Sequence, residues 1–261
     1  MKAGLGGHLV NPSNKSEIES STQSRPEDFP AIAMRHGEPA FPEVFSISAG
    51  AVVRSLAIVS ATLVSISMLT RLAGLEIGRL DVDVENSVPT LWSVQLLFLL
   101  AILLGIRGFL GRRTGEPQTG WVIVVLAAVF VGLDEGLAVH EELIEPVRGA
   151  LGTGGLLYQA WMIPYAVLVL LGGLALVPWF RSIEPHLRNR LFGAAGIFLL
   201  GAFGSEAIGG VIIDSGGFDS AGYTVVVSIE EALEMAGVIY AIAALLRSVS
   251  KQETAAFALR A

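Results

Sequence analysis

Three apolar segments of this chain carry carboxylate and imidazole side chains, which could bind protons or a divalent cation. The first contains VGLDEGLAVHEEL, the second contains GSEAIGG and the third contains SIEEALEM. An ionised carboxylate in the middle of a membrane costs about 2.5 kcal/mol or more, so such residues normally face a cavity or a partner and mark a functional site. The candidate site residues are Asp134, Glu135, His140, Glu141, Glu206, Glu230, Glu231 and Glu234.

These negative charges are not balanced within their own segments, because no Lys or Arg lies at the same depth. They could be neutralised by protons, because burial and like-charge repulsion favour the neutral carboxylic acid, or by a bound cation. Oxygen ligands with one imidazole suit Mn, Fe(II), Mg or Zn better than copper(I). We therefore expect the site to bind either protons or one of these divalent metals. The residues most expected to form it are, in order, Asp134, Glu234, Glu206, Glu141 and His140.

Helical spacing predicts which of the side chains share a face. If the first segment is one continuous helix, Asp134 and Glu141 lie on one face and His140 lies on its flank. In the third segment, Glu230 and Glu234 are neighbours at i, i+4. Acidic faces with one His resemble the carboxylate and His arrangement that helical bundles use to bind metal pairs. The match is partial, because the Glu-x-x-His spacing is absent.

Several of these acids also have a simpler interpretation. Glu142 lies near the end of its segment, where we expect solvation at the headgroups, and Glu230 could reach the interface in the same way. A lone His140 is more often a hydrogen-bonded structural residue than a ligand. Asp134 and Glu234 lie too deep to be solvated at the headgroups. Each is about 18–20 Å from the cytoplasmic end of its segment at 1.5 Å per residue.

Membrane-spanning helices must position these residues. Hydrophobic residues make up 52% of the 261 residues and charged residues only 16%, whereas a soluble domain carries about 25% charged residues. Six apolar runs have the ~20 residues that a spanning helix needs, and none has a polar face for water. The sequence therefore predicts an all-α fold, a polytopic integral membrane bundle of about six transmembrane helices, over 50–73, 91–110, 121–144, 157–180, 190–213 and 223–247.

The composition divides the chain into three parts. Residues 1–47 are polar and contain five of the eleven prolines, which is typical of a disordered tail, and Met34 is an alternative start. The transmembrane domain is expected over 48–248, and residues 249–261 are expected to form a short cytoplasmic tail.

The arginines and lysines near the segment ends predict the orientation. They cluster after the second, fourth and sixth segments, at Arg107, Arg112, Arg113, Arg181, Arg188, Arg190, Arg247, Lys251 and Arg260. The opposite connections are acidic or neutral. The positive-inside rule therefore places both termini in the cytoplasm and the acidic residues in the outer half of a membrane, which we expect to be a bacterial plasma (inner) membrane.

Several functions are not expected from this composition. A net charge of −7 with only three lysines disfavours nucleic-acid binding, and the absence of cysteine excludes thiolate chemistry. Retinal would need an intramembrane Lys, haem ligated by two His would need two intramembrane His, and nucleotides would need a P-loop or a Gly-rich turn after a strand. We therefore expect no haem, flavin, nucleotide or retinal.

The sequence thus predicts a multi-pass membrane protein whose Asp/Glu/His cluster binds a divalent cation or protons. Besides a binding site of undetermined use, three roles are open: a metal-dependent enzyme acting on a lipid or another apolar substrate, a small ion-coupled transporter, and a non-catalytic scaffold subunit. The apolar cytoplasmic halves of several segments weaken the transporter hypothesis. The lipid bilayer is the expected partner, and the oligomeric state is left open.

Overall fold

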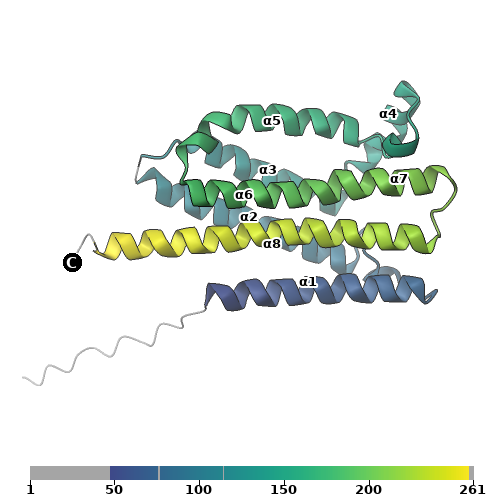
Figure 1. The fold of residues 1–261 in the computed structure, drawn as a ribbon, viewed down its shortest axis with the longest axis horizontal. Helices are drawn as coiled ribbons and strands as arrows, with labels where there is room; N and C mark the ends of the chain where they lie inside the picture. Colours follow the sequence, from purple (N-terminus) through teal and green to yellow (C-terminus); the bar gives the residue numbers. More distant parts are fainter. Residues whose placement is uncertain (1–47, 76, 114, 259–261) are drawn as a thin grey trace, which may run out of the picture. The chain divides into compact units, whose positions relative to one another are not determined.

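The computed structural model describes residues 48–75, 77–113 and 115–258. The predicted disordered tail over 1–47 therefore lies outside the described residues. Within the described part of the chain every regular element is helical and no β-strand occurs (Figure 1).

Six helices among the described residues are long and apolar enough to cross a membrane. They are α1 (Ala49–Leu72), α2 (Val88–Arg112), α3 (Gln118–Leu137), α5 (Met162–Ser182), the continuous helix α6–η4–α7 (Pro185–Leu199, Leu200–Ser205, Glu206–Asp214) and α8 (Ala221–Ala258). The connections contain η1 (Gly78–Leu80), η2 (Glu141–Leu143), α4 (Ile144–Leu151) and η3 (Gly155–Leu157). The all-helical fold and the six apolar helices that the sequence predicts are confirmed.

The surface of α5 shows why lipid suits this fold better than water. Leu168, Leu170, Leu171 and Leu174 on this helix are 56–62% exposed. Soluble monomers rarely expose contiguous apolar patches of this kind. The six helices are therefore compatible with a multi-pass membrane protein.

Helix α8 lies at the centre of the helical packing. It packs against α1, α2, α6, η4 and α7, and Figure 1 shows it between α1 on one side and α6–α7 on the other. Met235, Ile242 and Leu245 on α8 are at most 1% exposed. Side chains on α8 consequently meet those of most other spanning helices.

Two glycines allow the α6–η4 segment to approach α8 closely. A Cβ at Gly237 would lie 2.8 Å from the carbonyl oxygen of Ala194 and 2.8 Å from the backbone nitrogen of Phe198. A Cβ at Gly201 would lie 2.8 Å from the carbonyl oxygen of Glu230. Because these neighbours are backbone atoms, they cannot move aside as a flexible side chain could. Small residues at such crossings let helix backbones pack tightly in lipid.

The third spanning helix is shorter than the predicted segment 121–144. Helix α3 stops before Ala138, which adopts a left-handed conformation with φ 50° and ψ 37°. Asp134 stabilises this end, because its carbonyl oxygen accepts a hydrogen bond from the Ala138 N–H and its carboxylate accepts one from the His140 N–H at 2.9 Å. The predicted helical face shared by Asp134 and Glu141 is therefore wrong.

Two further features lie at the opposite end of the bundle. Arg107 lies inside α2, is 2% exposed, and forms a bidentate pair with Glu116 at 2.7 and 3.0 Å. A buried, neutralised arginine contributes less to the positive-inside rule than the exposed Arg112 and Arg113. In addition, α8 continues as a helix through residues 249–258, within the expected C-terminal tail.

We expect Gly201→Ala and Gly237→Ala each to lower the free energy of unfolding by about 1–3 kcal/mol, because the added methyl group meets backbone atoms. Thermal unfolding of the detergent-solubilised protein measures this loss. Gly172→Ala on α5 is the matched control, because no atom lies within 4 Å of its added Cβ and alanine favours a helix. Equal melting temperatures for all three variants would contradict the close packing of α6–η4 on α8.

Candidate functional site

The carboxylates of α3, α7 and α8 converge at one end of the bundle. Glu135 on α3 interacts electrostatically with Glu231 and Glu234 on α8, and Glu206 at the start of α7 interacts with Glu230 and Glu234. All five side chains are partly buried. We call Glu135, Glu206, Glu230, Glu231 and Glu234 the acidic cluster. The structure thus brings together five of the eight candidate residues.

Other carboxyl groups dominate the electrostatic surroundings of the α8 glutamates. The charged neighbours that act on Glu234 are Glu135, Glu206 and Asp134, all of them acids. The charges of Glu206, Glu231 and Glu234 likewise act on Glu230. The acidic cluster therefore brings like charges together, and its carboxyl groups repel one another when they are ionised.

The helix containing Glu206 changes its winding just before this residue. The six residues of η4 form a π-helical turn, which ends at Ser205, and such turns are frequent at functional sites. Gly201 in this turn packs on α8, where a Cβ would lie 3.0 Å from Cγ of Glu234. The turn and the glycine together place Glu206 beside the acids of α8.

Asp134 differs from the acidic cluster because its carboxylate is fully engaged by neighbours. It is 7% exposed, and its Oδ1 accepts hydrogen bonds from the Tyr165 hydroxyl and the His140 backbone N–H, each at 2.9 Å. Its Oδ2 lies 3.3 Å from Nδ1 of His140. Asp134 therefore caps the end of α3 and orients the His140 imidazole, which is a structural and positioning role.

The imidazole of His140 lies at the rim of the acidic cluster, with its side chain 21% exposed. Burial lowers the pKa of His140, but the hydrogen bond and charge of Asp134, followed by the charges of Glu135 and Glu141, raise it by more. The net pKa lies above the ordinary value of about 6.5. His140 thus gains a proton more readily than a free histidine does.

Aromatic side chains cover the region between Asp134 and Glu206. Trp161 is 6% exposed and donates a hydrogen bond from Nε1 to Oε1 of Glu206 at 3.1 Å. Its ring lies 5.0 Å from the His140 ring and 5.1 Å from the Tyr165 ring, measured between centroids. Trp161 therefore engages Glu206, Tyr165 engages Asp134, and the two rings contact each other. The i, i+4 spacing of Trp161 and Tyr165 at the start of a spanning segment is the signal that could have indicated this role.

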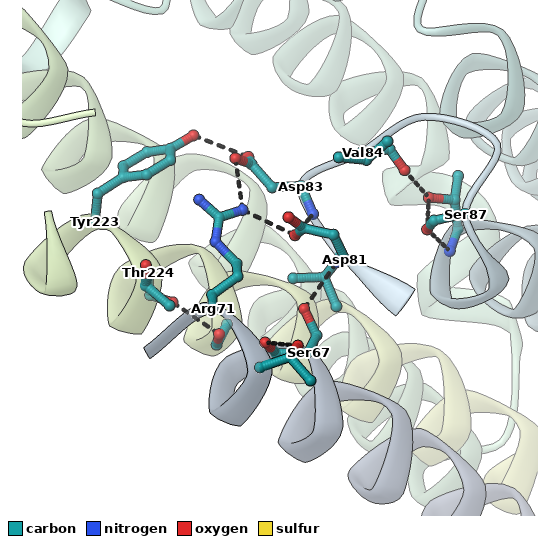
Figure 2. Close-up of polar contacts among 12 residues, drawn as sticks. Ser67, Arg71, Asp81, Asp83, Val84, Ser87, Tyr223 and Thr224 are labelled. Carbon is teal, nitrogen blue, oxygen red and sulfur yellow. Dashed lines mark hydrogen bonds and ion pairs between the residues drawn. The ribbon is translucent and has the colours of Figure 1, made fainter. Parts of the chain in front are cut away.

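An ion-pair network fixes the connection between α1 and α2 (Figure 2). Its Asp83 acts electrostatically on Glu231 of the acidic cluster. Nη1 of Arg71 lies 2.8 Å from Oδ1 of Asp81 and 2.8 Å from Oδ2 of Asp83. The hydroxyl of Tyr223 on α8 donates a hydrogen bond to Oδ1 of Asp83 at 2.9 Å. This connection is therefore attached to both α1 and α8.

Two acids of the same connection extend the site beyond the candidate residues. Burial raises the pKa of Asp83 by more than the Arg71 and Tyr223 contacts lower it. Burial also raises the pKa of Glu85, and the charge of Glu141 adds to this effect. Oε2 of Glu85 is buried and accepts no hydrogen bond from the described residues. The alternating acids in the sequence DVDVEN are the signal that could have found them.

The remaining candidate, Glu141, lies on η2 and is exposed, as is its neighbour Glu142. Glu141 contributes charge at the rim, and its position outside a spanning helix follows from the early end of α3. Within residues 48–75, 77–113 and 115–258, no group of three or more His, Asp and Glu side chains has the geometry of a metal site. The geometry therefore gives the predicted divalent metal no direct support.

The family comparison covers this entire region. The model of the family described as Domain of unknown function (DUF8692) matches residues 44–249, which include all six apolar helices as far as residue 249 and the whole acidic cluster. The chain belongs to this family. No curated protein and no solved structure matches the chain.

The raised pKa of His140 predicts a specific pH dependence of stability. Because the folded protein binds this proton more tightly than the unfolded chain, protonated His140 stabilises the fold in full below about pH 6.5, and this contribution is lost as the pH rises through the folded-state pKa. We expect His140→Gln to reduce the fall in Tm between about pH 6 and 8. His186→Gln, at an exposed histidine of α6, is the control and should leave the Tm profile unchanged.

The Arg71 network predicts a charge-dependent stability effect. Arg71→Gln should lower the free energy of unfolding by about 1–3 kcal/mol, because Asp81 and Asp83 lose their cationic partner while they are 19% and 16% exposed. The additional change Asp83→Asn should restore part of the loss. Arg79→Gln, at an exposed arginine, serves as the control in thermal unfolding. A double variant less stable than Arg71→Gln alone would argue against like-charge repulsion.

Proposed function

We propose that this chain is an integral protein of a bacterial plasma membrane whose acidic cluster binds exchangeable protons. The observation that carries the proposal is the convergence of five carboxyl groups at one end of the bundle. The charges that act on the three glutamates of α8 are those of other carboxyl groups. In a medium of low dielectric constant, such groups cannot all be ionised without a counter-ion. Protons are the smallest agent that neutralises them.

The distribution of exposed charges supports an orientation with both termini in the cytoplasm. Arg112, Arg113, Arg181 and Lys251 are exposed at the end of the bundle opposite the acidic cluster. The positive-inside rule then puts this end in the cytoplasm and the acidic cluster in the outer half of the membrane. In this orientation the cluster exchanges protons with the outer aqueous phase.

His140 is positioned to exchange protons between the acidic cluster and water. It is held by Asp134, partly exposed, and electrostatically coupled to Glu135. An imidazole that changes charge near neutral pH is suited to proton exchange with solvent. The next turns of α8 beyond Glu234 bury the apolar side chains of Met235, Val238 and Ile242. These side chains therefore supply no proton-accepting group that would extend a proton path from the acidic cluster toward the other end of the bundle. A site accessible from one side suits a pH-responsive membrane protein better than a proton-conducting one.

A divalent metal bound through His140 is the second candidate, and one observation favours it. Asp134 engages Nδ1 of His140, and a carboxylate on one ring nitrogen is the usual outer partner of a histidine that binds metal through the other. A metal held at Nε2 with carboxylates of the site would act as a Lewis acid or water activator for a lipid or another apolar substrate. This candidate corresponds to a membrane-embedded metal-dependent enzyme.

Infrared difference spectroscopy across a pH titration tests the proton-binding function directly. The full chain in lipid nanodiscs should show a carboxylic acid C=O band that persists at neutral pH, because clustered acids in a nonpolar environment retain protons. Glu234→Gln should remove part of this band, whereas Glu142→Gln at an exposed glutamate should not. Fully ionised carboxylates at neutral pH would refute the proposal. Stoichiometric retention of Mn or Zn that is lost in His140→Gln would instead support the metal candidate.

A further inference from the structure

Helices α1 and α8 enclose an apolar groove of about 420 Å³ on the side of α8 that faces α1. Its walls consist largely of small side chains, so the two helix backbones leave space that no side chain fills. The residues that matter here are Ala57, Ala61, Ala232, Ala236, Tyr240 and Arg247. The volume lies within the ~300–1,000 Å³ of ordinary small-molecule sites.

The groove opens toward the surroundings of the bundle rather than into its core. Ala57, Ala61 and Ala236 are exposed, and no residue of α1 before Ser60 is fully buried. Both helices belong to the apolar segments that are long enough to cross a membrane. In a bilayer, an open apolar groove of this size is filled by hydrocarbon, because the lining atoms otherwise lose their dispersion contacts. An amphiphile of the membrane therefore has access to it.

A cationic side chain marks one end of the groove. Arg247 is exposed, and no described residue forms an ion pair with it. The lining residues of α8 extend from Arg247 back to Ala232, a rise of about 22 Å, and those of α1 extend from Val53 to Val64, a rise of about 16 Å. Both lengths are at least half of the ~30 Å hydrocarbon thickness of a bilayer. The groove therefore extends from the membrane interface at Arg247 to the region of the bilayer centre, which is the reach of one acyl chain.

We propose that this groove binds one anionic phospholipid. Its acyl chain lies along the alanines of α1 and α8, and its phosphate accepts hydrogen bonds from the guanidinium of Arg247. Basic residues beside grooves between transmembrane helices recognise anionic headgroups in this way. Lys251, one helical turn beyond Arg247, adds positive charge at the same headgroup level. The headgroup end of the groove at Arg247 lies thirteen residues after Glu234, a rise of about 20 Å, whereas its far end at Ala232 lies on the same turns of α8 as the acidic cluster.

Native mass spectrometry of the full chain in detergent tests the site with two probes of equal chain length, phosphatidylglycerol and phosphatidylcholine. The wild-type protein should retain phosphatidylglycerol in preference to phosphatidylcholine. Arg247→Gln should weaken phosphatidylglycerol retention about five- to tenfold, because one cationic partner of the phosphate is lost. Ala236→Phe or Ala61→Phe should reduce the retention of both lipids by filling the groove.

Matched variants separate the groove from general effects of charge and size. Arg181→Gln removes an exposed arginine outside the groove, and Ala166→Phe enlarges an exposed alanine of α5. Both should retain phosphatidylglycerol as the wild type does. Equal losses in Arg181→Gln and Arg247→Gln would overturn the site in favour of nonspecific attraction. Unchanged lipid retention in both groove-filling variants would show that no lipid occupies the groove. If the wild type is a dimer and the groove-filling variants are monomers, a second copy of the chain occupies the groove instead.

Discussion

The contact between α8 and the α6–η4 segment determines how the functional end of this bundle is built. Where Gly201 and Gly237 face neighbouring backbone, the two helices approach closely enough for Glu206 to meet Glu230 and Glu234. At such separations the repulsion between ionised carboxylates is strong in a medium of low dielectric constant. The backbone packing therefore holds together acids that would separate if they were free, and this repulsion is the basis of the proposed proton binding.

The two ends of the bundle handle buried charge in opposite ways. Arg107 is buried with Glu116 as a bidentate pair, which also receives a hydrogen bond from Trp121 at 3.2 Å. This pair satisfies both charges locally and needs no ligand. Among the described residues no Arg or Lys forms an ion pair with the acidic cluster, and the cation that acts on it is the titratable His140, beside Glu135. This contrast is the main reason to regard the cluster as functional and the Arg107 pair as structural.

Helix α3 brings His140 to the rim of the acidic cluster by ending early. If α3 continued to residue 144, His140 would lie about 1.7 turns beyond Asp134 along the helix. Instead the chain turns at Ala138 and brings the His140 imidazole back to the Asp134 carboxylate. The imidazole thereby remains partly exposed while it contacts buried acids. The ring of Trp161 contacts the imidazole, and the hydroxyl of Tyr165 donates a hydrogen bond to the Asp134 carboxylate.

The sequence by itself determined the all-helical architecture and the six apolar helices, because hydropathy is a property of each segment alone. Helical rise also predicted a common depth for Glu135, Glu206 and Glu234, but not that they lie beside one another. Only the tertiary structure decided which acids are already satisfied. Asp134 ranked first in the sequence analysis, yet Tyr165, 31 positions away, engages it, and Asp83 is bound by Tyr223, 140 positions away. Hydrogen-bond partners so distant along the chain are set by helix packing, which no local pattern encodes.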